Sequence, residues 1–428
     1  MNQPDVSVNA WVFLNEDEPQ GSTYKTPGSS YQSLIDYGVY KNVDMVNMCF
    51  AEVIPTGPDT VPAGDGSAFT IRIGAPQHNQ QYMLWMIEDA RAANPDIKLL
   101  VTLGYGAPDM LTQIFTGGQS QWQQDAEKFA ANLVAYLDHY GLDGFDVDWE
   151  YPISSAGTPQ QFAVLFTAIR AAMGTNGRYL LTLSPASVGV LDAATVNAAF
   201  DFLNLQLYSG FTFPGNFTSA GVSADLLAYG AKFESNFQTA QQAYEGYRSG
   251  GYRVATQWRL NSDNFQFEQA QQMILYQLIH GPAGTDFDDT NIVEAAGSPP
   301  ISAMTIRAGD VIDAIQATNG AFAMPQHGGG GGQPATVDIA PGDAIASISG
   351  YTGIWYGWSC VLQLTITTRN GQVFGPYGSM SGVTSSTPFS FTAPAGQSIV
   401  AFSGSIVYVP EAGGDPSYIV ASLNPSFG

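Results

Sequence analysis

Short apolar runs alternate with longer segments of helical periodicity over about the first 280 residues. Eight of these runs predict strands, at residues 8–14, 45–54, 98–104, 142–151, 179–185, 202–208, 226–233 and 253–260. Segments that predict helices lie between them, among others at residues 82–93, 126–140, 160–173 and 265–280. This alternation is typical of βα units around a parallel sheet, and eight such strands predict an α/β fold of the (β/α)8 TIM-barrel class.

The pattern changes after residue 280. From Gly281 onward the chain is rich in Gly, Ser, Thr and aromatic residues, its apolar positions alternate with a period of two, and a glycine run stands at residues 328–332. Such texture predicts an all-β unit. Residues 301–306 also have the pattern of a strand, but we assign them to this second unit and not to the barrel. We therefore expect two domains, at residues 1–280 and 281–428.

The charge balance restricts the partners. The chain has 428 residues with 14 basic and 37 acidic side chains, a net charge of −23, and only 12% of its residues are charged. A strongly acidic protein is repelled by nucleic acid and by anionic membranes, whereas a neutral polysaccharide is compatible with it. No apolar run is long enough to span a membrane. Surfaces poor in charge are common among secreted carbohydrate-active proteins, so we expect an extracellular protein, although no signal peptide is visible.

Two cysteines are too few for a disulfide framework. Cys49 lies in an apolar run far from Cys360, and we expect both to be buried thiols. The sequence indicates neither a metal site nor a cofactor.

Three carboxylates stand two residues apart in the fourth apolar run. Side chains two apart share a face of a strand, so Asp146, Asp148 and Glu150 are predicted to point together into the barrel, with Val147 and Trp149 facing the helices. Like charges this close cannot all ionise, so at least one proton is shared, and we expect the acid nearest the barrel mouth to keep it. A single strand-end carboxylate would more often cap a helix or pair with arginine. The full row favours acid catalysis with Glu150 as the general acid.

The row with Asp143 resembles the Asp-x-x-Asp-x-Asp-x-Glu signature of glycoside hydrolase family 18. Further matches follow in the order of that family's strands: Phe50-Ala51; residues 98–106, with Thr102 and Tyr105 where Ser and Gly are usual; Gln206-Leu207-Tyr208; and Trp258.

The resemblance implies a retaining, substrate-assisted reaction. Glu150 would protonate the leaving oxygen while the acetamido carbonyl of the substrate attacks the anomeric carbon. Asp148 would orient the acetamido group, Asp146 would take up a proton or charge, and Tyr208 would donate to the acetamido oxygen. The residues expected to bind substrate are Trp258, Gln206, Asp143, Tyr105 and Phe50, although Asp143 better suits a role in holding the strand end. Tyr208 and Trp258 could instead be barrel-filling aromatic residues.

The expected substrate is chitin or another N-acetylglucosamine polymer, cut at β-1,4 linkages. The interval between residues 233 and 253 is too short for the insertion that walls the groove of some chitinases, so an open cleft and endo cleavage are expected. Two alternatives stay open: an endo-β-N-acetylglucosaminidase acting on N-glycans, and a non-catalytic chitin-binding protein or component of a host-directed toxin.

The last 148 residues resemble a jacalin-related lectin, an all-β jacalin-like β-prism of three Greek-key sheets. The matching pieces are residues 287–289, 306–315, 327–329, 345–350, 368–378, 388–389 and 399–404. The resemblance implies sugar binding by two loops, and the candidate contacts are Gly281, Gly284, Gly413, Gly414 and Asp415. Ser417 stands where the family has its Asp, if residues 419–423 form the last strand. A cell-surface glycan is a possible partner, and a prism kept for packing or protein contact is the alternative.

Overall fold

A computed structural model describes residues 6–14, 24–73, 80–104, 111–150, 158–189, 191–234, 237–280, 286–409 and 417–428. The chain divides into two compact units, residues 1–268 and 269–428. This division falls inside helix α9 (Phe265–His280), whereas the sequence placed the boundary at the end of that helix. The domain limits of 280 and 281 stay a prediction.

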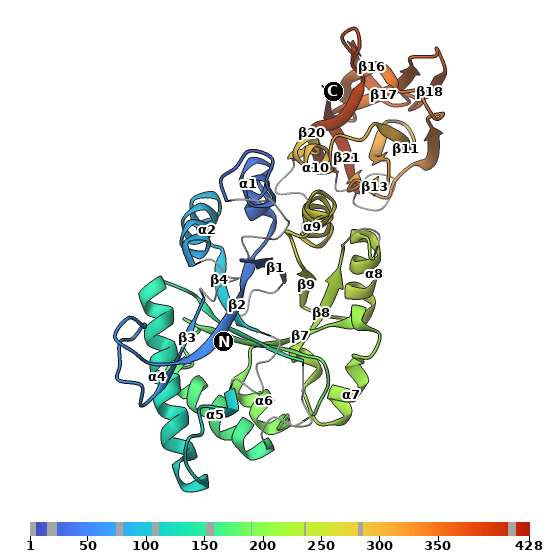
Figure 1. The fold of residues 1–428 in the computed structure, drawn as a ribbon. Coiled ribbons are helices and arrows are strands. Elements are labelled where there is room, and N and C mark those ends of the chain that lie inside the picture. Colours follow the sequence, from blue (N-terminus) through green and yellow to red (C-terminus); the bar gives the residue numbers. More distant parts are fainter. Residues whose placement is uncertain are drawn as a thin grey trace. The chain divides into compact units, whose positions relative to one another are not determined.

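Eight parallel strands close a barrel in the first unit (Figure 1). They are β1 (Ser7–Phe13), β2 (Met45–Pro55), β4 (Lys98–Leu103), β5 (Gly144–Trp149), β6 (Leu180–Pro185), β7 (Phe202–Leu205), β8 (Leu227–Lys232) and β9 (Val254–Trp258). Neighbours in sequence are neighbours in the barrel, and β1 pairs with both β9 and β2. All eight predicted strands are confirmed. A ninth strand, β3 (Phe69–Arg72), was not predicted and pairs antiparallel with the end of β2.

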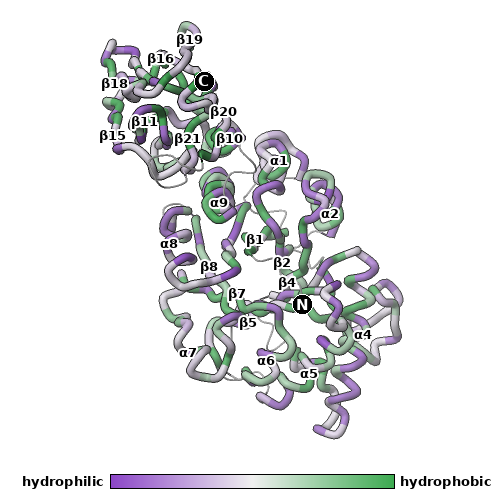
Figure 2. Tube along the Cα trace, turned by 180° about the vertical axis from the view of Figure 1, so that it is seen from behind, coloured by the Kyte–Doolittle hydropathy of each residue, from purple (hydrophilic) through white to green (hydrophobic). Residues whose placement is uncertain are grey.

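Helices follow most barrel strands, and the four predicted helices are confirmed as α2 (Gln80–Ala93), α4 (Trp122–Tyr140), α5 (Pro159–Met173) and α9. Hydrophobic colour follows the barrel strands, and hydrophilic segments lie along α4 and α8 (Figure 2). Thr158 and Gln161 form a capping box at the start of α5, and Gly141, at φ 65°, ends α4. The shorter helices are α1 (Ser30–Asp36), α6 (Ala193–Ala199), α7 (Pro214–Ser219) and α8 (Ala240–Gly250), with 3-10 turns η1 (Val39–Asn42), η2 (Gln119–Gln121), η3 (Leu207–Ser209) and η4 (Ala224–Leu226).

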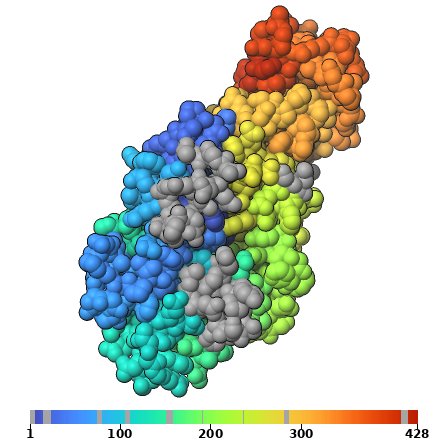
Figure 3. All heavy atoms as spheres, in the orientation of Figure 1, coloured from blue at the N-terminus to red at the C-terminus, as the bar shows by residue number. Residues whose placement is uncertain are grey.

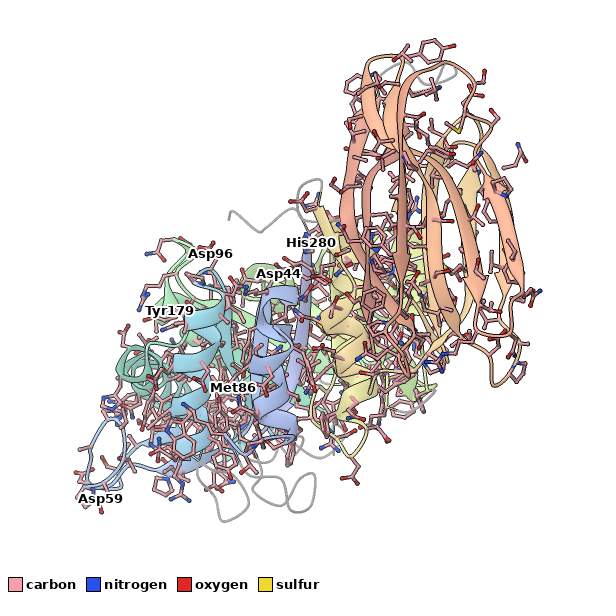
Figure 4. All side chains as sticks on the ribbon, turned by 90° about the horizontal axis from the view of Figure 1, so that it is seen from above. Asp44, Asp59, Met86, Asp96, Tyr179 and His280 are labelled. Atoms are coloured by element: carbon pink, nitrogen blue, oxygen red, sulfur yellow. The ribbon has the colours of Figure 1, made fainter. Side chains whose placement is uncertain are left out.

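Labelled residues identify the end of the barrel at which the strands begin and the end at which they finish. Asp44, Asp96 and Tyr179 each shortly precede a barrel strand and lie along one side of this unit (Figure 4). Asp59, in the loop after β2, lies toward the other side (Figure 4), and this loop forms a blue lobe on the surface (Figure 3). Because the strands are parallel, all their C-terminal ends meet at this second side, where TIM barrels place their reactive groups.

The N-terminal end of the barrel is filled with apolar side chains. One buried cluster draws a residue from each of five strands: Met45, Leu100, Phe202, Ala228 and Val254. This packed layer closes the barrel interior below the polar residues, so the open space lies at the C-terminal end.

The second unit consists of three antiparallel sheets. One contains β10 (Asp286–Asp288), β20 (Ile399–Val409) and β21 (Ser417–Phe427); one contains β11 (Ile301–Ala308), β12 (Ile312–Asn319), β13 (Phe322–Ala323), β14 (His327–Gly328) and β15 (Gln333–Asp338); and one contains β16 (Ile345–Trp355), β17 (Trp358–Thr368), β18 (Val373–Tyr377) and β19 (Val383–Thr392). A short helix, α10 (Thr290–Ala295), precedes β11. Residues 301–306 thus belong to this unit, as predicted. Cys360 is buried here and Cys49 in the barrel, and no disulfide joins them.

Candidate active site

The carboxylate row lies on β5, and its side chains alternate as the strand pattern predicted. Trp149 points outward and makes edge contacts with Phe162 and Phe166 of α5. Asp146 is fully buried inside the barrel, and Asp148 lines the cavity at its mouth with Glu150.

Asp146 sits among hydroxyl groups of the neighbouring strands. The register places it beside Thr102 of β4 and Thr182 of β6. Thr182 Oγ1 donates to its carboxylate at 2.5 Å, Ser184 Oγ at 3.2 Å and Asn204 Nδ2 at 3.3 Å. Burial raises the pKa of Asp146 to about 6, against the opposing effect of these donors and of Thr102.

Asp148 and Glu150 lie together at the mouth of the barrel. Gln206, directly after β7, donates from Nε2 to Asp148 Oδ1 at 3.2 Å and to Glu150 Oε1 at 2.6 Å. Burial raises the pKa of Asp148 well above its ordinary value, and the charges of Glu150 and Asp146 raise it further. Asp148 therefore keeps its proton to higher pH than an ordinary aspartate, and its side chain is hydrogen-bonded to Glu150. The raised pKa falls on the middle residue of the row, whereas the sequence placed the retained proton on the outer one.

Tyr208 lies in η3 at the edge of the same cavity. Burial raises the pKa of its hydroxyl well above the ordinary value, and the negative charges of Asp148 and Glu150 act in the same direction. The phenol therefore stays protonated and can donate a hydrogen bond into the cavity.

The cavity has a volume of about 430 Å³ and an aromatic wall. Phe50, within β2, stacks on Trp258, at the end of β9, with ring centroids 5.9 Å apart at 26°. Trp11 of β1 lies 6.4 Å from Trp258 and donates from Nε1 to Thr102 Oγ1 at 3.2 Å. Flat rings beside hydrogen-bonding groups suit the faces and hydroxyls of a pyranose.

Asp143 lies at the opposite end of β5 from Glu150. Its carboxylate accepts from the backbone N–H of Leu99 at 2.9 Å and pairs with Arg91 at 3.2 Å. These contacts fasten the start of β5 to β4, and Asp143 is not among the residues that line the cavity. Its inclusion with the substrate-binding residues is corrected: it is a strand-end residue.

Other predicted residues lie outside the described part of the chain. They are Tyr105 of the barrel and the lectin-loop candidates Gly281, Gly284, Gly413, Gly414 and Asp415.

Several cavity residues were not predicted. Trp11, Ser184, Asn204, Thr256 and Lys232 all line it. Ser184 and Asn204 could have been found by extending the strand parity of the carboxylate row to β6 and β7, because Ser184 pairs with Asp148 in the register. Lys232 has no such signal, since a lysine at a strand end is usually a solvated residue.

Neither a metal site nor a membrane span emerges from the described residues. They hold no cluster of three or more His, Cys, Asp or Glu side chains suited to a metal ion. Among them, no helix has the length and apolar character needed to cross a membrane.

Comparison with known proteins places both units. Residues 17–252 match "Glycosyl hydrolases family 18", and residues 276–408 match "Jacalin-like lectin domain". Among curated proteins, the chain is 33% identical over 129 residues to "Endochitinase" of Brugia malayi, which is 28% of this chain and 24% of that protein. It is 26% identical over 150 residues to "Chitotriosidase-1" of Mus musculus, 31% of each chain. The chain thus spans less than a third of the length of these relatives.

Solved structures resemble each unit separately. An artocarpin–mannotriose complex covers 34% of this chain and 91% of its own, with 23% identity and a TM-score of 0.26. Malaysian banana lectin covers 34% of this chain at 30% identity and a TM-score of 0.24, with 94% of its own chain matched. Human YKL-39, described as a pseudo-chitinase with retained chitooligosaccharide binding, covers 64% of this chain and 98% of its own at 11% identity and a TM-score of 0.45. With Asp148 and Glu150 of the signature brought together at the mouth of a closed barrel, the chain belongs to glycosyl hydrolase family 18 and carries a jacalin-like lectin domain after the barrel in the sequence.

Proposed function

We propose that the protein is a retaining endo-glycosidase that hydrolyses β-1,4 linkages of N-acetylglucosamine polymers. The observation that carries the proposal is the hydrogen-bonded pair Asp148 and Glu150, bridged by Gln206. It supplies an acid and a polar anchor in one cavity with the aromatic wall of Trp258 and Phe50. The related proteins named as chitinases favour chitin as the polymer.

The first half of the reaction uses the substrate's own acetamido group. Its N–H binds Asp148 and stabilises the carboxylate form there, so that a proton held by Asp148 passes to Glu150. Glu150 gives this proton to the glycosidic oxygen as the bond from that oxygen to the anomeric carbon breaks. The acetamido oxygen forms the new bond to the anomeric carbon and receives a hydrogen bond from Tyr208. The leaving sugar departs as an alcohol, and an oxazolinium ion remains.

The second half restores the enzyme. Glu150, now a carboxylate, takes a proton from water while the water oxygen attacks the anomeric carbon. The bond to the acetamido oxygen breaks, and the product keeps the β configuration. Asp146 lies behind the reacting groups and has a pKa of about 6. It can therefore gain or lose a proton near neutral pH and compensate for the change of charge on Asp148.

The direct test is Glu150→Gln in the full chain. Mass spectrometry measures the hydrolysis of a six-sugar chitin oligomer, and NMR identifies the anomer of the product that forms first. We expect wild type to release the β anomer and the variant to lose about 10²-fold or more in kcat. Glu127→Gln, an exposed change on α4, is the matched control. Comparable turnover by wild type and Glu150→Gln, or none by wild type, would defeat the proposal.

The choice of polymer is tested in the same assay with an N-glycan beside the chitin oligomer. Faster cleavage of the N-glycan core would replace chitin with the endo-β-N-acetylglucosaminidase alternative. Binding without cleavage of either substrate would favour the non-catalytic alternative. Chitin and N-glycans both occur outside the cytoplasm. We therefore propose that the protein acts in an extracellular setting and that its lectin domain holds it on glycan.

A further inference from the structure

A charged cluster lies at the ends of β8 and β9, and one of its members, Lys232, lines the cavity. The register pairs Lys232 with Trp258, and Glu234 follows two residues after Lys232. Glu234 Oε2 lies 3.1 Å from Lys232 Nζ, and Glu234 Oε1 lies 3.5 Å from Arg259 Nε. The three side chains are 25%, 24% and 15% exposed, so one partly buried carboxylate serves two partly buried cations.

Each cation lies over aromatic rings of the site. Arg259 Cζ is 5.8 Å from the ring centre of Trp258 and 5.5 Å from that of Phe13. Lys232 Nζ is 5.7 Å from the ring centre of Tyr208, a residue that the proposed mechanism uses as a donor. These are distances at which a cation is attracted to the face of a ring. Glu234 therefore connects the two aromatic residues that would hold the reacting sugar.

Phe237 extends this arrangement away from the reacting groups. Its ring centre lies 5.6 Å from Lys232 Nζ and 6.5 Å from the Tyr208 ring in an edge contact. The position of the lysine thus affects both rings. Because a lysine side chain is long and flexible, it keeps one position only when an ion pair such as that with Glu234 holds it.

Among the described residues, Glu234 is the carboxylate that forms ion pairs with both Lys232 and Arg259. Glu268 also lies close, but it is fully buried, and burial raises its pKa to about 7 while Ser262 donates to it. Asp148 and Glu150 line the same cavity as Lys232. A cation next to a carboxylate stabilises its charged form, so the position of this lysine matters to the pair.

We propose that Glu234 is a positioning residue of this site: it fixes Arg259 behind Trp258 and Lys232 beside Tyr208, and it keeps the lysine from pairing with Asp148 and Glu150. The inference rests on the proposed glycosidase function. It predicts two effects of Glu234→Gln together, weaker sugar binding and an acid that loses its proton at lower pH. A residue that only stabilised the fold would not shift the pH profile.

The experiment measures kcat and KM of the full chain on a chitin oligomer as a function of pH, for wild type, Glu234→Gln and the matched control Glu127→Gln. We expect Glu234→Gln to raise KM about 5- to 10-fold and to move the alkaline limb of kcat/KM down by about half a pH unit. The control should match wild type. The double variant Lys232→Met with Glu234→Gln should return the limb to the wild-type position, because the cation that shifted it is gone. An unchanged limb and KM in a folded Glu234→Gln protein would overturn the inference.

Binding separates this inference from the proposed function. In the Glu150→Gln background, titration with the same oligomer is followed by tryptophan fluorescence, with and without Glu234→Gln. An affinity loss of about 5-fold or more supports the role of Glu234 even if wild type proves inactive, in which case only the enzymatic proposal fails. Equal affinities beside normal wild-type turnover overturn the role of Glu234 alone.

Discussion

At the scale of single residues, Asp146 couples the site to stability. Its pKa is raised to about 6 by burial, so between pH 4 and 6 the folded state binds more protons than the unfolded state, and stability falls as pH rises through this range. The shift of about two units corresponds to about 3 kcal/mol between pH 4 and pH 7. Asp146→Asn cannot ionise. The difference in unfolding free energy between variant and wild type should therefore change by about that amount across this range, with wild type relatively more stable at the acid end.

Urea unfolding of both proteins at several pH values measures this difference. Equilibrium unfolding curves are sufficient, and folding kinetics are not needed, because only the change of the unfolding free energy with pH is compared. Parallel stability curves for the two proteins would show that Asp146 titrates normally in the folded state.

Tyr208 gives a second residue-scale prediction, on activity. Tyr208→Phe keeps the ring beside Lys232 and removes the hydroxyl that would stabilise the acetamido oxygen as charge develops. We expect a loss of about 10²-fold in kcat with KM changed less than about 3-fold, the pattern of an interaction made in the transition state. Steady-state kinetics on a chitin oligomer measures it. A rise in KM at unchanged kcat would assign Tyr208 to ground-state sugar binding instead.

The residues that sequence could predict are those with a pattern inside one element. Asp146, Asp148 and Glu150 share a strand face, and one run of residues contains their spacing. Lys232, Glu234 and Arg259 come together only because the register sets Lys232 beside Trp258. No local pattern contains that register, so the cluster and the proton on Asp148 emerge only from the folded barrel.

At the scale of elements, one buried ion pair joins α5 to the strand behind it. Arg170 Nη2 of α5 lies 2.6 Å from Asp201 Oδ2, and that carboxylate also accepts from the backbone N–H of Leu181 in β6 at 2.8 Å. The two side chains are 10% and 4% exposed. Asp201→Asn leaves a buried guanidinium without its counter-charge and should cost about 3 to 5 kcal/mol.

Thermal unfolding monitored by circular dichroism measures this cost, with Asp138→Asn as the control, because its partner Arg178 is more than half exposed. That exposed pair should contribute about 1 kcal/mol or less. Equal losses in the two variants would mean that the buried pair is not specially important to the barrel.

The elements themselves were largely predictable, because the barrel strands form short, mostly apolar runs and the helices between them have a different period. The strand β3 was missed for a physical reason. It spans only Phe69–Arg72 and pairs with the part of β2 that extends beyond the barrel, so it has no long apolar run of its own. Its pairing depends on partners 14 to 20 residues away in the sequence.

At the scale of the whole molecule, two units with different periodicities follow each other in the sequence, and that contrast made both folds predictable. The limit between them falls within α9, because this helix continues the barrel pattern while most of its length, from Gln269 onward, belongs to the second compact unit. Ala270, Met273, Ile274 and Leu275 of that helix are buried in the full chain. A chain ended at residue 280 keeps the whole helix, whereas one ended at residue 268 loses these four side chains.

We expect the chain 1–280 to fold and to hydrolyse soluble chitin oligomers with the kcat of the full protein, and the chain 1–268 to unfold at a temperature lower by several degrees.

On beads that carry both chitin and a glycan bound by the lectin domain, the full protein should act at least about 10-fold faster than 1–280, because lectin binding raises the local concentration of the barrel at the polymer. Rates on soluble and bead-bound substrate, measured side by side, test this. Equal bead rates for the full chain and 1–280 would mean that the prism does not anchor the enzyme, and equal stability of 1–268 and 1–280 would move the boundary to residue 268.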